Sequence, residues 1–348
     1  MRRRSGRRGS PGLPGVLQSK EVGIMRRKKA IRIAAVAVLL LAGLALVSPK
    51  NLSAVSARWG ADYFPNVPLI TQDGRTVRFY DDLLKDKIVA IDLIYTRCQF
   101  ECPLETARMA QVQQLLGDRV GRDIFFYSIS IDSEWDTPKI LKAYAEKYHA
   151  GPGWQFLTGR PEDVELISKK LGLYSDPKKS RDGHTAALMI GNVASGQWMR
   201  NSATDNPRFL AIMIGEFLNG WRNHTAEPVK SYAEARPLVV GPGEYLFATR
   251  CAACHTLGGG DDVGPDLQGV TAVRDRAWLS RFIKTPDRML AEKDATALAL
   301  MAKYNQVPMP NLLLGDDDVA ALIAYLDAQS RGVRRPDQRP HEHHWPAH

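Results

Sequence analysis

The sequence predicts an α/β domain followed by an all-α domain, behind one apolar segment near the N-terminus. Strand-like and helix-like stretches alternate from residue 63 to about residue 226, which is typical of an α/β layer fold. Residues 243–331 have helical composition and no strand pattern. The length of 348 residues has room for about two domains of ordinary size.

The elements of the α/β part follow in a regular order. Residues 87–95 (KIVAIDLIY) form an apolar run typical of a buried strand, and residues 103–116 have helical composition. We then expect a strand at 123–131, a helix at 138–148, a strand at 155–158, a helix at 161–171 and a hairpin made by 186–191 and 197–200. In the all-α part, residues 316–328 repeat apolar positions at helical spacing.

These patterns divide the chain into consecutive parts. They are a basic arm at 1–32, an apolar segment at 33–50, a tether at 51–62, the α/β domain at 63–226, a linker at 227–242, the all-α domain at 243–331 and a tail at 332–348. Four of the last eight residues are histidines. Such a tail could hold copper loosely, but we interpret it as a solvated, disordered segment.

The positive charge of the chain lies entirely in its first part. The whole sequence has a formal net charge of +9, but residues 1–32 contain eleven Lys or Arg against the single acid Glu21, a balance of +10. The remaining residues therefore carry −1. Neither predicted domain has the basic surface that binding to phosphate backbones requires, which argues against a nucleic-acid partner.

The apolar segment favours a membrane location. Residues 33–47 (IAAVAVLLLAGLALV) carry no charge and follow the basic stretch 26–29. Fifteen residues in a helix span about 22 Å, short of the ~30 Å hydrocarbon core unless 30–31 join the helix and Arg32 snorkels. The length also suits a signal-peptide core, although no strong cleavage site follows directly. We interpret 33–50 as an uncleaved anchor, with a cleaved signal segment as the alternative.

Either interpretation gives the same topology. The positive flank stays in the cytoplasm, so both folded domains are exported to the periplasmic face of a bacterial cytoplasmic membrane, behind a single transmembrane helix. The stretch MRRKKAIRI, which starts at Met25, reads as a complete n-region. Residues 1–24 are therefore either a genuine cytoplasmic arm or the result of a start codon assigned too early.

The second cysteine pair indicates a haem. Cys251-Ala252-Ala253-Cys254-His255 is a CxxCH, in which two thiols can add across the vinyl groups of a haem while the histidine ligates the iron. A zinc site or a redox dithiol is the alternative for this spacing. The exported location, the following Gly264-Pro265 and Met309 in a proline-rich loop favour haem. A proline there can direct its carbonyl to the second ring nitrogen of His255.

The all-α region resembles class I cytochromes c over roughly ninety residues. The resemblance includes Gly243 and Phe247 near the start of the region and Tyr325 near its end, where that family crosses its terminal helices. It implies one haem c, attached covalently to Cys251 and Cys254, with His255 as proximal and Met309 as distal ligand. The alternative for Met309 is a purely structural role, as a side chain packed in the core. Met289 and Met301 are weaker candidates because they lie in helix-like stretches.

The first cysteine pair indicates a soft metal or thiol chemistry. Cys98 and Cys102 stand in a CxxxC between a predicted strand and a predicted helix, and the spacing places both sulfurs on one face. A helix N-terminus favours thiolate over thiol. Two close thiolates suit Cu(I) better than calcium or magnesium. The pair could also close into a disulfide.

The α/β region resembles the Sco/SenC family of thioredoxin-like copper proteins over about 160 residues. The matching stretches are VPLITQDG at 67–74, the YTxCxxxCP of 95–103, SISIDSEWDTP at 128–138, LKAYAEKY at 141–148 and the Gly-Trp before LTG at 157–159. The resemblance implies a thioredoxin-like fold and one copper bound by Cys98, Cys102 and a distant histidine, which falls on His184. We interpret His149 and His224 as surface residues.

Together the two resemblances imply a copper chaperone that prepares the copper site of cytochrome c oxidase. Its partner would be the copper-bearing oxidase subunit or another periplasmic copper or thiol client, and its haem would exchange single electrons. Two alternatives remain at this point. One is a thiol–disulfide oxidoreductase with Cys98 and Cys102 as catalytic cysteines, and the other is a c-type electron carrier.

Overall fold

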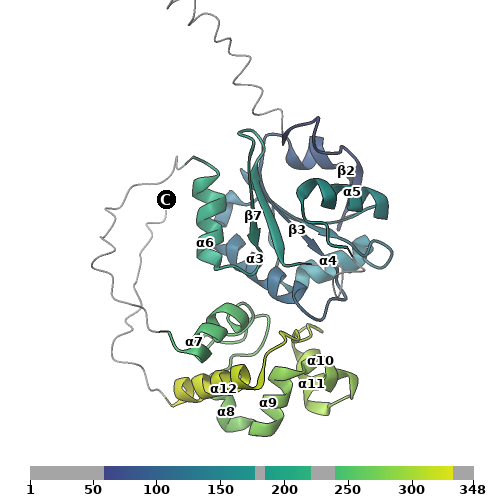
Figure 1. Cartoon of the computed structure of the whole chain (residues 1–348). Helices are drawn as coiled ribbons and strands as arrows, with labels where there is room; N and C mark the ends of the chain where they lie inside the picture. The colour runs from purple at the N-terminus through teal and green to yellow at the C-terminus, as the bar shows by residue number, and fades with distance from the viewer. Residues whose placement is uncertain (1–58, 177–184, 221–239, 332–348) are drawn as a thin grey trace, which may run out of the picture. The chain divides into compact units, whose positions relative to one another are not determined.

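The computed structural model describes residues 59–176, 185–220 and 240–331. Within these residues no helix has both the length and the apolar character that a membrane crossing requires. The apolar segment at 33–50, like the basic arm and the tail, lies outside the described residues. The described residues contain an α/β region with a mixed sheet and a helical region toward the C-terminus (Figure 1).

One seven-stranded sheet organises the α/β region, with strand order β2-β1-β5-β4-β3-β6-β7. The strands are β1 (Pro68–Thr71), β2 (Thr76–Arg78), β3 (Ile88–Ile94), β4 (Ile124–Ser130), β5 (Trp154–Thr158), β6 (Ala187–Asn192) and β7 (Gln197–Ser202). The three central strands β3, β4 and β5 run parallel, whereas each outer strand pairs antiparallel with its inner neighbour. The sheet is therefore mixed, as expected for a thioredoxin-like domain.

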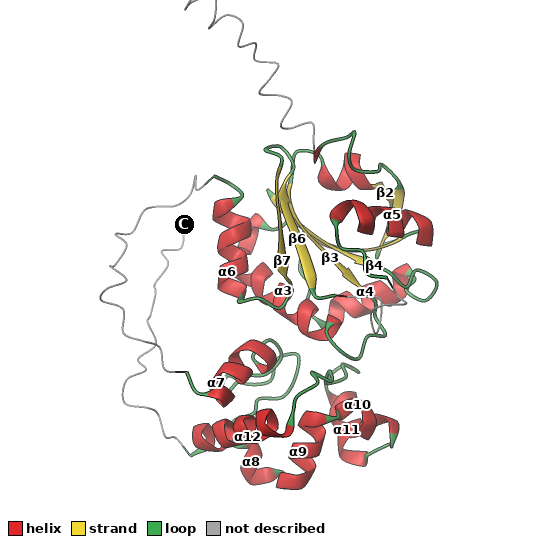
Figure 2. Ribbon diagram, viewed as in Figure 1, coloured by secondary structure: helices red, strands yellow, loops and turns green. Residues whose placement is uncertain are grey.

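Helices cover both faces of this sheet (Figure 2). One face packs against α3 (Cys102–Leu116), α4 (Pro138–Lys147) and α6 (Pro207–Ile212), and the other against α5 (Pro161–Leu171) and the helical turn η2 (Phe79–Leu84). Every residue of β3 is buried, because alternate side chains enter the two cores. This is why the strand reads as an unbroken apolar run in the sequence.

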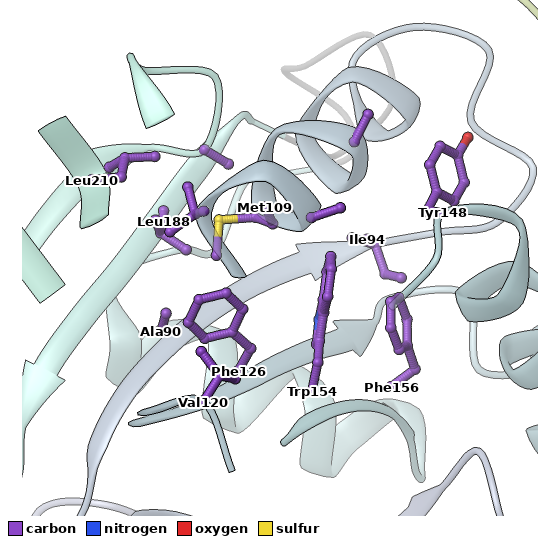
Figure 3. Close-up of a cluster of buried hydrophobic side chains, with 14 of the residues drawn as sticks. Ala90, Ile94, Met109, Val120, Phe126, Tyr148, Trp154, Phe156, Leu188 and Leu210 are labelled. Atoms are coloured by element: carbon purple, nitrogen blue, oxygen red, sulfur yellow. The ribbon is translucent and has the colours of Figure 1, made fainter. Parts of the chain in front are cut away.

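The core beneath α3 and α4 is rich in aromatic rings. Figure 3 shows Trp154, Phe126 and Phe156 from the strands beside Tyr148, which follows α4. The Trp154 ring lies 5.1 Å from that of Phe156 and donates its indole N–H to the Ser128 hydroxyl at 2.9 Å. Packed rings of this kind bury large apolar areas in fixed orientations, so they hold the N-terminal end of α3 firmly against the sheet.

The helical region is built around the crossing of its first and last helices. The elements are α7 (Pro242–Leu246), η6 (Phe247–Cys251), α8 (Val270–Val273), α9 (Arg276–Lys284), α10 (Pro286–Ala291), α11 (Ala295–Lys303) and α12 (Asp316–Ser330). A Cβ atom on Gly243 would lie 2.1 Å from the Ala321 carbonyl oxygen of α12, so only glycine permits this approach. The Phe247 and Tyr325 rings meet 5.6 Å apart. The predicted crossing at these three residues is confirmed.

The predicted strands and helices of the α/β part are present within one or two residues of the expected ends. The hairpin of β1 and β2, the helix α6 and the turn that follows it were not predicted. The first two strands have four and three residues, which is too short for a period-two pattern to stand out.

Candidate functional sites

The two cysteines of the CxxxC lie where β3 passes into α3. The strand ends at Ile94 and the helix begins at Cys102, with Pro103 in its first turn. The Cys98 amide donates to the Tyr95 carbonyl at 3.1 Å, which closes the intervening loop. Cys98 is 5% exposed and Cys102 is fully buried, and neither forms a disulfide in the structure.

The two thiols differ strongly in acidity. A hydrogen bond from the Cys102 thiol lowers the pKa of Cys98 to about 5, against the opposing effect of burial, and the Phe100 and Cys102 amides lower it further. Burial and that same hydrogen bond hold the pKa of Cys102 well above its usual range. At neutral pH the pair therefore contains one thiolate, on Cys98, and one thiol. A thiolate is the protonation state that a nucleophile or a soft-metal ligand requires.

A buried carboxylate anchors the loop before the cysteines. Asp136 is fully buried and accepts hydrogen bonds from the Thr96 amide at 3.1 Å and the Ser130 hydroxyl at 2.5 Å, as well as from the Thr96 hydroxyl. Buried carboxylates are stable only when they are hydrogen-bonded in this way. Asp136 thus determines the position of Thr96, two residues before Cys98. It was not singled out in the sequence, although it lies in the matched SISIDSEWDTP stretch.

Two further acids lie buried near the thiols. Burial raises the pKa of Asp92, in the middle of β3, to about 6. Burial, followed by the charges of Asp92, Glu101 and Cys98, holds the pKa of Glu105 well above its usual range. Both pKa values are raised because a charge in this apolar core would be poorly solvated. Sequence patterns missed them, since a single acid in an apolar run gives no motif.

Replacing Asp92 by asparagine is expected to change how stability depends on pH. The folded-state pKa of about 6 exceeds the ordinary aspartate pKa of 3.8, so the folded chain binds a proton that the unfolded chain has released. The wild type should therefore lose about 2 kcal/mol of unfolding free energy, relative to Asp92→Asn, as the pH rises from about 4 to about 6. Urea unfolding at several pH values measures this difference.

The exposed acid Asp73, changed to asparagine, is the control for that experiment. The Asp73→Asn chain should follow the wild-type profile throughout. If Asp92→Asn also runs parallel to the wild type between pH 4 and 6, the Asp92 carboxyl is not protonated in the folded chain.

The third predicted copper ligand, His184, lies outside the described residues. Among residues 59–176, 185–220 and 240–331, no group of three or more His, Cys, Asp or Glu side chains is arranged to hold a metal ion. A cavity of about 590 Å³ adjoins Cys98 and is lined by Thr96, Pro103 and Tyr144, among others. The two sulfurs, one of them a thiolate, form a soft donor set that suits Cu(I).

The predicted haem residues lie together in one cavity of the helical region. This cavity of about 440 Å³ is lined by Cys251, Cys254, His255 and Met309. The rest of its wall is mostly apolar and includes Phe247, Leu279, Ile283, Leu322 and Leu326. An apolar pocket with two thiols, an imidazole and a thioether fits a covalently attached haem. The structure therefore brings together all four residues that the sequence singled out.

His255 is prepared as an iron ligand. Its Nδ1 lies 2.9 Å from the Pro265 carbonyl oxygen; a carbonyl can only accept, so Nδ1 carries the proton and Nε2 is left for the iron. Burial lowers the pKa of His255, which keeps the ring neutral. A Cβ atom on Gly264 would lie 2.6 Å from Cε1 of the ring. The expected role of the Gly-Pro pair is confirmed.

The three candidate methionines lie in the kinds of element that the sequence predicted, two in helices and one outside them. Met289 lies within α10 and is 1% exposed, and Met301 lies within α11. Met309 follows α11 in an irregular segment. Met301 and Met309 both border the cavity, so the two compete as candidates for the distal ligand. Of the other histidines, His149 is exposed and His224 lies outside the described residues.

Two family models match the two regions of the chain that carry the cysteine motifs. The family model described as SCO1/SenC matches residues 59–202, and the one described as Cytochrome c matches residues 240–330. A SCO1 protein homolog of Bacillus subtilis is 38% identical over 101 residues, which is 28% of this chain and 51% of that protein. The chain thus spans about half the length of this relative.

Two further matches cover other parts of the chain. A SCO2-like protein of Rickettsia felis is 27% identical over 184 residues, or 50% of this chain and 82% of that protein. A solved cytochrome c domain of a Pseudomonas putida protein is 49% identical and covers 26% of this chain and 88% of that domain, with a TM-score of 0.24.

The fold and the two sites define a protein with two cysteine motifs, one in an α/β region and one in a helical region. A thioredoxin-like domain carries a buried CxxxC, and a helical domain carries the CxxCH of a c-type haem. The family matches make the assignment specific. Residues 59–202 are an SCO1/SenC domain, and residues 240–330 are a C-terminal cytochrome c domain.

Proposed function

We propose that this chain is a membrane-anchored copper chaperone for the copper site of cytochrome c oxidase, and that its haem sets the oxidation state of the copper it carries. The observation that carries the proposal is the Cys98–Cys102 pair, in which a thiolate lies beside a buried thiol at the start of α3. Such a pair is a strong site for a soft metal ion. Copper is here a cargo, with His184 as the third ligand.

The haem domain gives the site a one-electron partner. A bound haem c supplies single electrons, and a copper ion changes oxidation state by one electron, whereas a dithiol–disulfide couple requires two. A methionine ligand raises the haem potential, whereas protein dithiol couples lie at about −120 to −270 mV. The haem would therefore accept electrons from a dithiol rather than reduce a disulfide. Copper is therefore a better partner than a dithiol for exchanging single electrons with the haem.

The N-terminal sequence is the basis for proposing that the chain is anchored in a membrane. The uncharged residues 33–47 follow a strongly basic flank, which favours a cytoplasmic N-terminus and exported domains. Protease added to spheroplasts should digest both domains and leave a short membrane-bound fragment. Protection of both domains until the membrane is disrupted would contradict this orientation.

Metal content tests the copper site. The haem-containing chain, given Cu(I) without oxygen beside a strong competing chelator, is expected to retain one copper per haem. Cys98→Ser and His184→Ala should each lose it, while His149→Ala, on an exposed loop, should retain it. Failure of the wild type to hold copper against the chelator would overturn copper delivery.

The second candidate function is thiol–disulfide exchange, which the acidity difference of the two thiols favours. Cys98 would attack as the thiolate and Cys102 would resolve the mixed disulfide. His184→Ala distinguishes the functions, because a metal site loses a ligand and a dithiol loses little. Oxidase assembly that survives His184→Ala in cells but not Cys102→Ser would favour the thiol reaction.

A further inference from the structure

Helix α3 carries two polar side chains that reach the haem-site turn. The Arg108 guanidinium donates to the Thr249 carbonyl oxygen at 3.0 Å and to that of Ala248 at 3.4 Å. Gln111, one turn further along α3, donates to the Ala252 carbonyl oxygen at 2.8 Å and accepts from Arg108 at 2.9 Å. The three carbonyl groups belong to the turn that bears Cys251 and leads to Cys254.

Arg108 is buried beside backbone carbonyls of the haem domain. Its side chain belongs to the thioredoxin-like domain, yet the residue is 3% exposed. A buried guanidinium is costly unless it is hydrogen-bonded, and here its acceptors include two carbonyls from the end of a helical segment. Such terminal carbonyls lack partners within their own helix and carry negative partial charge. The side-chain donors of Arg108 and Gln111, which we call the docking clamp, therefore complement the carbonyl acceptors of this turn.

Other contacts surround the docking clamp. Ala253 and Val263 of the haem domain are 2% and 8% exposed and belong to the same apolar cluster as Leu104 and Ala107 of α3. The Asn311 amide donates to the Gln99 carbonyl at 2.9 Å, within the CxxxC itself. Three separate segments of the haem domain thus contact the surroundings of the cysteine pair.

The haem cavity and the cysteine pair share a wall. Pro103, which follows Cys102, lines the haem cavity. Tyr148 is 1% exposed and lines the cavity that adjoins Cys98. The same cavity is lined by Pro103 as well. Pro103 therefore belongs to the walls of both cavities.

We propose that the docking clamp holds the haem domain against α3, so that single electrons pass between haem and copper within one chain past Pro103, which lines both cavities. The inference rests on the proposed function. One electron balances the step: Cu(II) at the cysteine pair is reduced to Cu(I) while the haem iron goes from ferrous to ferric, and no bond is made or broken. Arg108 and Gln111 are positioning residues in this step.

Hydrogen exchange of the Asn311 amide tests the docking, and this test needs no copper. The amide donates to the Gln99 carbonyl of the other domain. In the haem-containing full chain this amide is expected to be protected from hydrogen exchange. The double variant Arg108→Met, Gln111→Ala should exchange it at least tenfold faster. Arg122→Met, which removes an exposed arginine of the same domain, should leave the rate unchanged. A wild-type amide that exchanges as fast as in the double variant overturns the clamp.

The electron route is tested by loading Cu(II) onto the ferrous chain and following the haem spectrum. Oxidation should be first order and independent of protein concentration in the wild type, and at least tenfold slower in the double variant. A double variant that has lost amide protection but keeps the wild-type rate overturns the route. If the wild type shows protection but no electron exchange, the proposed function fails while the clamp stands.

A folding control accompanies both measurements. The double variant should keep its copper stoichiometry and circular dichroism, because Arg108→Met retains the aliphatic part of the side chain. If it does not fold, Gln111→Ala alone removes the hydrogen bond to Ala252 and should give at least threefold faster exchange at Asn311. An unchanged rate there contradicts the clamp.

Discussion

Replacement of Cys98 by serine is expected to slow alkylation of the reduced, metal-free chain at pH 6 by at least tenfold. The Cys98 pKa of about 5 makes this sulfur a thiolate at that pH, whereas the remaining Cys102 thiol has a pKa well above 9. Burial alone still raises the pKa of Cys102, so its thiolate fraction at pH 6 would be far lower than that of Cys98. The greater nucleophilicity of a more basic thiolate offsets only part of that difference, with a Brønsted slope of about 0.4–0.5.

The matched variant is Cys102→Ala, which keeps Cys98 but removes the donor of its principal hydrogen bond. Its alkylation rate should still rise with pH, but with the midpoint moved upward from about 5. A small iodoacetamide reagent and mass spectrometry measure both profiles. A midpoint that stays near 5 in Cys102→Ala would show that some other group acidifies Cys98.

Replacement of Met309 by alanine is expected to remove the distal ligand of the haem. The ferric chain should lose the near-infrared charge-transfer band of methionine ligation. Its reduction potential should fall by about 0.1 V or more, because axial ligands tune haem potentials over a range of about 0.8 V. Absorption spectra and a redox titration of the haem-containing chain measure both changes.

Met301→Leu is the matched control, because Met301 borders the same cavity from within α11. Leucine is close to methionine in volume, so this change should cost little packing. The Met301→Leu chain should keep the charge-transfer band and the wild-type potential. If instead Met301→Leu loses the band and Met309→Ala keeps it, the distal ligand lies on the helix.

Features that depend on neighbouring residues were predictable from the sequence. The run at 87–95 predicts β3 because a central parallel strand is apolar on both faces. The CxxCH and the Gly-Pro pair that follows predict the environment of His255, since only ten residues separate His255 from the Pro265 carbonyl that it contacts. Local spacing of this kind leaves the chain few ways to arrange the groups.

Features that join distant segments were not predictable. Asp136 binds Thr96 across 40 residues, and Arg108 binds Thr249 across 141. Each partner taken alone is an ordinary polar side chain or backbone carbonyl with no motif. Its role depends on burial, which removes competing water and makes an unpaired group costly. The acidity of Cys98 is determined in the same way, by a thiol and amides that only the folded loop assembles.

The two domain classes, the two cysteine motifs and the candidate haem residues were therefore readable from the amino-acid sequence, because periodicity and short spacing constrain local geometry. The difference in acidity between the two thiols, the raised pKa values of the buried acids and the contact between α3 and the haem-site turn arise only in the folded chain. These properties follow from desolvation and from contacts between residues far apart in the chain, and no local pattern encodes them.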